Sequence, residues 1–136
     1  MSRIDTNRKA KKLAVSKLES NRYKITSSIE NNEISVLSPK GNNFKIRVNG
    51  HIRRTWWDIK IEKPRDDLYY ILVEMVIKSP RYYIFTSKQL MKKCNDNFKA
   101  GVKRRERKGL SGLPTRGEGL NPGDTKGFDV WEILPE

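Results

Sequence analysis

A run of almost entirely apolar residues, LYYILVEMVI (Leu68–Ile77), limits what this chain can fold into more than any other segment. It is far too short to cross a bilayer as a helix. A run of this length that is rich in Tyr, Ile and Val is typical of a central strand buried on both faces. The turn sequence KSPR (Lys78–Arg81) then predicts that Tyr82–Phe85 returns as a neighbouring strand.

The residues before this run predict a hairpin. Apolar side chains alternate along Phe44–Asn49 and also along Glu33–Leu37, which indicates two strands with one apolar face each. The segment between them, SPKGNN (Ser38–Asn43), has turn chemistry, because Pro fixes φ and Gly permits positive φ. Two further segments are predicted as short strands: Arg22–Ser27 and Trp56–Ile61.

Helices are predicted before and after the strands. Residues 6–20 have apolar side chains at helical spacing, with Asp5 or Thr6 as the expected N-cap. A second helix opens at Thr86, because Gln89 three residues later completes a capping box, and it extends toward Lys108.

These elements together predict one domain over residues 1–136 with an α+β fold, in which a central mixed sheet of about five strands is flanked by helices. Residues 109–127 contain six glycines and two prolines and are expected to form a long Gly-rich loop.

The charge of the chain indicates a polyanionic partner. Its 136 residues carry a net charge of +13, and neutralising phosphates is the commonest use of such an excess. An acidic protein or an anionic surface would attract the same charge. We expect nucleic acid as the partner, and DNA rather than RNA.

Several classes of protein are excluded by what the chain lacks. Cys94 and His51 are the only residues of their types, so neither a disulfide framework nor a His/Cys zinc site can form within the chain. The N-terminus has no apolar signal core, so we expect a cytoplasmic protein without a membrane segment. Cys94 is expected in the core.

Several segments, taken in their order and spacing, resemble small bacterial members of the restriction-endonuclease-like superfamily, the PD-(D/E)XK nucleases. The resemblance covers roughly residues 8–134. Besides the basic N-terminal helix, the segments that carry it are VLSPKGNNFKIRVNG (Val36–Gly50), WWDIK (Trp56–Lys60), DLYYILVEM (Asp67–Met75), RYYIFTSKQL (Arg81–Leu90) and WEIL (Trp131–Leu134). It implies a restriction-endonuclease-like fold. Such nucleases often form homodimers, although no interface is evident in this sequence.

The resemblance also implies where catalytic residues would lie. In that family an Asp on the second strand and an acidic residue or Gln on the third bind a divalent metal, and a Lys two residues later orients the attacking water. The positions that match here are Glu33, Arg47 and Asn49. Arg47 cannot ligate Mg²⁺ and Asn49 cannot replace the ammonium group of Lys. We therefore expect no cofactor, a site that does not cleave, and an ion pair between Glu33 and Arg47.

Other residues offer weaker routes to catalysis. Asp58, Glu62 and Glu74 are further carboxylates, and each is expected to be a surface or partnered charge. His51 is expected to contact phosphate rather than to act as a general base.

Nucleic-acid binding requires cations and exposed aromatic rings, and the chain has three basic clusters that could clamp a phosphate backbone if they share a face. One of the two adjacent tryptophans is expected to point outward, where it could stack on a base. The predicted contact residues are Lys9, Lys12, Lys45, Arg47, His51, Arg53, Arg54, Trp56, Lys103, Arg104 and Arg105.

Three functions remain open on this basis. The first is a nucleic-acid-binding protein on a nuclease-like fold with a degenerate active site. The second is a Mg²⁺-dependent endonuclease that uses Glu33 with an atypical partner. The third is an inhibitor, of the kind that phages and mobile elements encode, that binds an acidic surface on a nucleic-acid enzyme.

Overall fold

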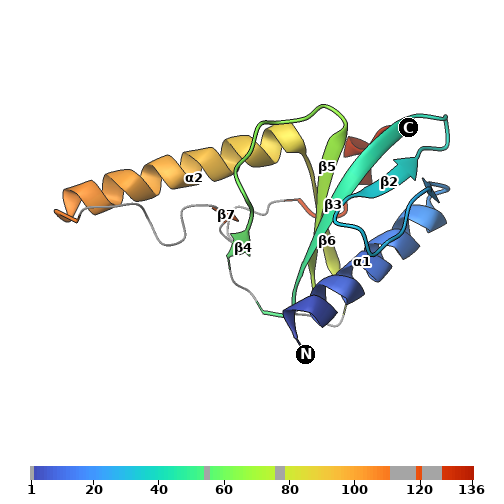
Figure 1. The fold of residues 1–136 in the computed structure, drawn as a ribbon, viewed down its shortest axis with the longest axis horizontal. Helices are drawn as coiled ribbons and strands as arrows, with labels where there is room; N and C mark the ends of the chain where they lie inside the picture. Colours follow the sequence, from blue (N-terminus) through green and yellow to red (C-terminus); the bar gives the residue numbers. More distant parts are fainter. Residues whose placement is uncertain (1, 54–55, 76–78, 111–118, 121–126) are drawn as a thin grey trace.

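The computed structural model describes residues 2–53, 56–75, 79–110, 119–120 and 127–136. Figure 1 shows the elements along the chain. They are α1 (Arg3–Ser20), β1 (Lys24–Ile25), β2 (Ile34–Leu37), β3 (Asn43–His51), β4 (Trp57–Asp58), β5 (Leu68–Glu74), β6 (Arg81–Thr86), α2 (Ser87–Arg107), β7 (Gly119–Leu120) and the 3-10 helix η2 (Trp131–Ile133).

Five of the strands form one mixed sheet in the order β1-β2-β3-β5-β6. Every neighbouring pair is antiparallel except β3 and β5, which run parallel. This confirms the predicted α+β fold with a mixed sheet of about five strands. The predicted strand at Trp56–Ile61 is reduced to β4, which pairs with β7 in a separate two-stranded sheet.

The first seven residues of the apolar run Leu68–Ile77 form β5, an internal strand between β3 and β6, and residues 76–77 lie outside the described residues. Ile71, Leu72 and Val73 are each fully buried, so side chains on both faces are covered, as predicted. Glu74 closes the strand, is also buried, and accepts a hydrogen bond of 3.3 Å from the Tyr83 hydroxyl group. A buried carboxylate without a hydrogen-bond partner is energetically costly, and the Tyr83 hydroxyl group supplies that partner.

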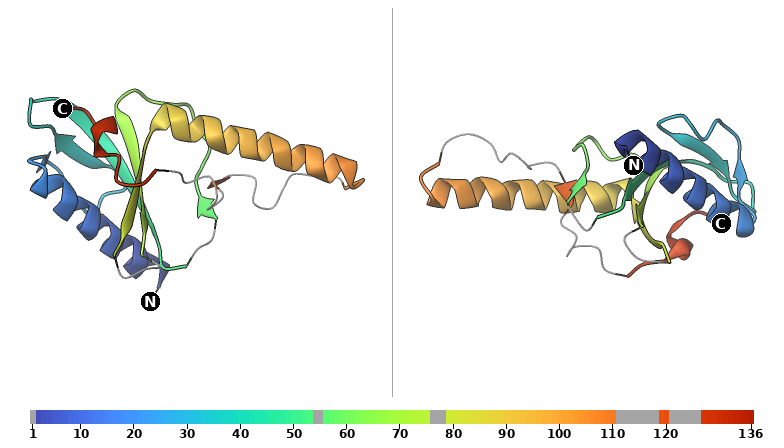
Figure 2. Two further views of the ribbon diagram at one scale, coloured as in Figure 1. Left: turned by 180° about the vertical axis from the view of Figure 1, so that it is seen from behind. Right: turned by 90° about the horizontal axis from the view of Figure 1, so that it is seen from below.

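The two helices cover opposite faces of the sheet. Ala10, Ala14 and Leu18 of α1 pack with the apolar residues of β2 and β3 on one face. Leu90 and Met91 of α2 pack on the other face with a second apolar cluster that includes Trp57. Figures 1 and 2 show that α2 covers the sheet with its first turns only and then projects well beyond it.

Capping explains where each helix begins. The hydroxyl group of Thr86 accepts a hydrogen bond from Gln89 N at 3.0 Å, and the Thr86 N–H donates one to Gln89 Oε1 at 3.1 Å, so the predicted capping box is confirmed. The predicted N-cap of the first helix was wrong. Ser2 is the N-cap, because its Oγ accepts a hydrogen bond from Asp5 N at 3.1 Å, and the helix therefore starts at Arg3.

Two core predictions are confirmed in the same region. Trp57 is 2% exposed, and Cys94 is fully buried on the side of α2 that packs on the core. Most of the Gly-rich segment 109–127 lies outside the described residues, as do residues 54–55 and 76–78. Among the helices that the structure describes, none is long and apolar enough to span a membrane.

Gly50, near the end of β3, allows α1 to lie directly on the strand. A Cβ atom at Gly50 would overlap the Cβ atom of Ala10 and would lie 3.2 Å from the backbone oxygen of Thr6. The backbone N–H of Gly50 also donates a hydrogen bond to Asn7 Oδ1 at 3.1 Å. The position of α1 therefore depends on the absence of a side chain at residue 50.

Replacing Gly50 with Ala is expected to destabilise the protein by about 1–3 kcal/mol, because the added methyl group overpacks a rigid contact between helix and strand. Chemical denaturation followed by circular dichroism measures the change. The matched control is Gly41→Ala in the hairpin turn, where a Cβ atom would meet nothing within 4 Å, so its cost arises from the positive φ alone. An unchanged free energy of unfolding in Gly50→Ala would contradict the close approach.

Candidate functional site

The polar side chains of β3 line up on the sheet face opposite α1. The apolar residues of β3 pack against α1, and side chains alternate between the two faces of a strand. The intervening residues are therefore on the same face as α2, and they form a half-buried row. In order along the strand they are Lys45, Arg47, Asn49 and His51.

Arg47 is held between two carboxylates. Its Nη2 lies 2.7 Å from Glu33 Oε2, and its Nη1 is paired with Glu62 Oε1. Nη1 also donates a hydrogen bond of 3.1 Å to the Tyr70 hydroxyl group. The three charged side chains are only 20–29% exposed, so solvent screens these interactions incompletely. The predicted pair between Glu33 and Arg47 is present, and a second acid reinforces it.

Sheet register explains why Glu33 and Arg47 meet. Strands β2 and β3 are antiparallel, with Ile34 opposite Ile46. Continuing that register by one residue places Glu33 opposite Arg47 on the face away from α1. Opposite charges that face each other across antiparallel strands stabilise the pairing.

Glu33 has a second guanidinium partner. Arg65 Nη1 lies 2.9 Å from Glu33 Oε2, and the same guanidinium group makes a two-point contact with Asp67 at 3.0 and 3.1 Å. Hydrogen bonds from Arg65 and then from Arg47 hold the pKa of Glu33 below its usual value. Glu33 is therefore a stable anion whose charge is already compensated by two cations.

The residues at the family's catalytic positions do not fit Mg²⁺. A magnesium ion requires hard oxygen ligands, but Arg47 occupies the space between the two carboxylates that come closest to providing them. Asn49 offers one amide oxygen and no ammonium group. Among the described residues no group of three His, Cys, Asp or Glu side chains is placed to hold a metal ion.

The two ends of the β3 row have different surroundings. At one end Lys45 Nζ donates a hydrogen bond of 2.9 Å to Ser35 Oγ. At the other end the His51 ring stacks on the buried Trp57 ring, with centroids 3.8 Å apart and planes at 7°. His51 is thereby fixed in orientation at the edge of a pocket.

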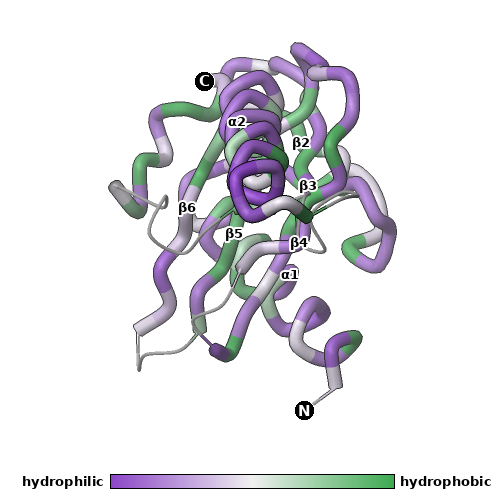
Figure 3. The backbone as a smooth tube through the Cα atoms, turned by 90° about the vertical axis from the view of Figure 1, so that its left-hand side faces the viewer, coloured by the Kyte–Doolittle hydropathy of each residue, from purple (hydrophilic) through white to green (hydrophobic). Residues whose placement is uncertain are grey.

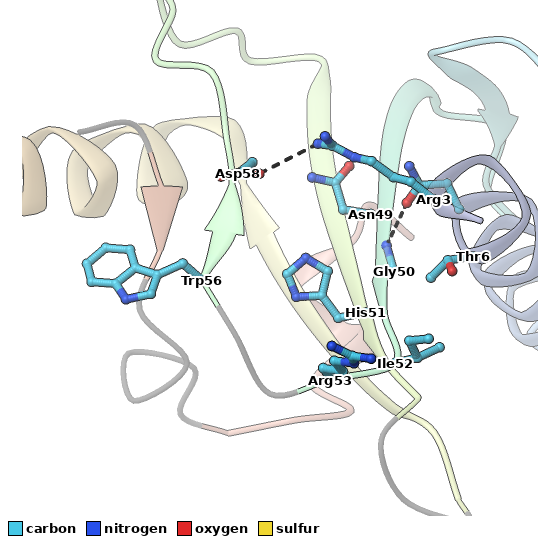
Figure 4. A pocket seen from close by; sticks show the side chains of 10 residues that line it. Arg3, Thr6, Asn49, Gly50, His51, Ile52, Arg53, Trp56 and Asp58 are labelled. Atoms are coloured by element: carbon cyan, nitrogen blue, oxygen red, sulfur yellow. Dashed lines mark hydrogen bonds and ion pairs between the residues drawn. The ribbon is translucent and has the colours of Figure 1, made fainter. Parts of the chain in front are cut away.

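This pocket, which we call the β3-end pocket, has a volume of about 500 Å³. It lies between the start of α1, the end of β3 and the start of β4 (Figure 4). Arg3 reaches from α1 across its mouth toward Asp58, 3.6 Å away (Figure 4). The residues that line it include Arg3, Asn7, Asn49, His51, Arg53 and Asp58.

The predicted basic clusters do not all share one face. Lys9 and Lys12 are exposed on α1, whereas Lys103, Arg104 and the half-exposed Arg105 lie on the projecting part of α2, which covers the opposite face. The clamp that required a common face therefore does not form from these two helices. Arg53 lies at the β3-end pocket, and Arg54 falls outside the described residues.

Trp56 is the partly exposed member of the tryptophan pair, as expected from strand alternation. Figure 4 shows its indole ring pointing away from His51 and Asn49. Trp56 is nevertheless one of the residues that line the β3-end pocket, so its stacking on a base stays a prediction.

Sequence reasoning missed Arg3 and Arg65 as members of this region, and it considered Asp58 and Glu62 only as surface or partnered carboxylates. Glu62 and Arg65 contact Arg47 and Glu33, respectively, and we call these four residues the Arg47 cluster. Arg3 and Asp58 lie at the mouth of the β3-end pocket. A signal for Arg65 was present in the sequence, since Arg65 and Asp67 stand two residues apart in a turn. The other three are brought in by tertiary contacts.

Comparisons with known proteins add no relative. A scan against models of protein families, a search of curated proteins and a search of solved structures each find no match. The resemblance to restriction-endonuclease-like proteins therefore stays a prediction from the sequence.

Proposed function

We propose that this protein binds nucleic acid, with the projecting part of α2 as its main contact, and that its nuclease-like sheet face does not cleave. The observation that carries the proposal is the charge of α2 beyond the sheet. From residue 99 to residue 108 this segment has six Lys or Arg residues and one acid, Glu106. Figure 3 views α2 end-on and shows its nearest turns mostly hydrophilic.

A helix segment that is polar on most of its sides gains little by packing on its own protein, and in residues 99–107 of α2 only Gly101 is buried. The apolar residues that anchor α2 lie in its first part, at Leu90, Met91 and Cys94. Beyond them, Lys99, Lys103 and Arg107 are exposed and four residues apart, so they lie along one side of the helix at intervals of about 6 Å. A line of cations at this spacing suits a phosphate backbone.

The lack of cleavage is proposed from the Arg47 cluster. Both carboxylates nearest to the expected metal position are paired with Arg47, and Glu33 is paired with Arg65 as well. A metal ion would have to displace a guanidinium group that is less exposed than its partners.

Fluorescence anisotropy with labelled single-stranded and duplex DNA and RNA tests the binding proposal. We expect log K to fall linearly with log salt concentration, with a slope of about −3 to −5 from four to six phosphate contacts. The same substrates incubated with Mg²⁺ or Mn²⁺ are expected to remain intact. No binding at low salt would overturn the proposal, and cleavage that is lost in Glu33→Ala would show an endonuclease instead. A protein partner retained after nuclease treatment would support the inhibitor hypothesis.

A further inference from the structure

We propose that the β3-end pocket binds one unpaired nucleotide, with its phosphate held by Arg3 and its base edge held by Asn49. This inference rests on the proposed function and assigns a separate subsite to it. The pocket is distinct from the Arg47 cluster and from α2, since no residue of either lines it.

The size and shape of the pocket favour a single nucleotide over a duplex. Its volume of about 500 Å³ lies within the range of sites that enclose small organic ligands. A double helix is too wide to enter such a space, so only a base that is free of its partner can be inserted.

The charges at the mouth favour a phosphate. Arg3 and Arg53 are both exposed and line the pocket at opposite ends (Figure 4), and Asp58 is the one acidic residue among the described residues that line it. Arg3 and Asp58 are 80% and 70% exposed and 3.6 Å apart, which is a weak ion pair. A phosphate can accept two parallel hydrogen bonds from a guanidinium group, so it competes well with this contact.

The interior offers groups that suit a base. Figure 4 shows the carboxamide of Asn49 between Arg3 and His51, on the pocket side of β3. A carboxamide has one acceptor and two donor hydrogens, the combination that pairs with the edges of bases. The backbone of β3 next to Asn49 is held in place, because the Gly50 N–H donates a hydrogen bond to Asn7 Oδ1 at 3.1 Å.

In this arrangement Asp58 is a weak ion-pair partner of Arg3 that competes with the phosphate of the ligand. Removing its charge is therefore expected to strengthen nucleotide binding, whereas removing the charge of Arg3 is expected to weaken it. If the ion pair between the two residues serves only to hold α1 against β4, neither substitution is expected to change the affinity for the nucleotide.

Isothermal titration calorimetry with adenosine 5′-monophosphate is the test, with adenosine and inorganic phosphate as separate probes. We expect Asp58→Asn to bind the nucleotide about threefold to fivefold more tightly, and Arg3→Gln to bind it about tenfold more weakly. Asn49→Ala is expected to weaken binding of the nucleotide and of adenosine but not of phosphate. Matched controls that change the same charges elsewhere are Asp96→Asn on α2 and Lys24→Gln on β1.

Equal effects from the pocket variants and the controls would overturn the inference, because they would reflect net charge alone. Binding of phosphate without any preference for the nucleotide would overturn the base contact. Oligonucleotide binding that persists while adenosine 5′-monophosphate fails to bind would remove the subsite and leave the proposed function intact. Nucleotide binding without oligonucleotide binding would support the subsite and overturn the proposed function.

Discussion

Replacing Lys99, Lys103 and Arg107 with Gln is expected to lower the affinity for nucleic acid about 500-fold at 0.1 M salt, because each phosphate contact contributes roughly a factor of 8 at that concentration. The slope of log K against log salt is expected to fall by about 3 units. All three side chains are exposed on the part of α2 beyond the sheet, so the fold is expected to be retained. Anisotropy titrations over a range of salt concentrations give both quantities.

A variant with the same loss of charge separates local contact from overall attraction. Lys9, Lys12 and Lys24 are exposed on α1 and β1, on the opposite face or at the opposite edge of the sheet from α2. Their replacement by Gln is expected to lower affinity only a few-fold, through long-range attraction that salt screens. Equal losses in the two triple variants would show that α2 is not the main contact.

Local patterns predicted most of the fold, for reasons that particular residues make clear. The buried run of β5, the alternation of β3 and the capping box at Thr86 each depend on residues close together in sequence. The parallel pairing of β3 with β5 was not predicted, since it joins Lys45 to Leu68 across a connection without a helix. Strand partners at that separation leave no local signal.

The part of the candidate site that depends on neighbouring strands of one hairpin was predictable from the sequence, and the rest was not. Glu33 and Arg47 belong to one hairpin, so register alone brings them together. Glu62 and Arg65 come from the connection between β4 and β5, and only the folded sheet places them beside β3. The positions of the basic clusters relative to one another were not predictable for the same reason. The charges on a helix do not determine which face of the sheet the helix covers.

The Arg47 cluster provides the second large effect. Arg47→Ala is expected to destabilise the protein by about 3 kcal/mol, because it leaves the partly buried carboxylate of Glu62 without its guanidinium partner and that of Glu33 with Arg65 alone. Glu33 and Glu62 are 25% and 29% exposed, so solvent compensates only part of the loss. Thermal and chemical denaturation measure the change. Lys45→Ala on the same strand is the control, since it removes one hydrogen bond to Ser35 and is expected to cost about 1 kcal/mol.

The same variant tests the proposal that Arg47 blocks the metal position. With Arg47 gone, Glu33 and Glu62 become a pair of oxygen ligands, so Mn²⁺ is expected to raise the melting temperature of Arg47→Ala and to leave the wild-type protein unchanged. Adding Glu33→Gln and Glu62→Gln to Arg47→Ala is expected to abolish the response to Mn²⁺ and to recover part of the stability, because no unpaired charge remains. A wild-type protein that responds to Mn²⁺ as strongly as the variant would show that Arg47 does not block the metal position, and the endonuclease hypothesis would then be favoured.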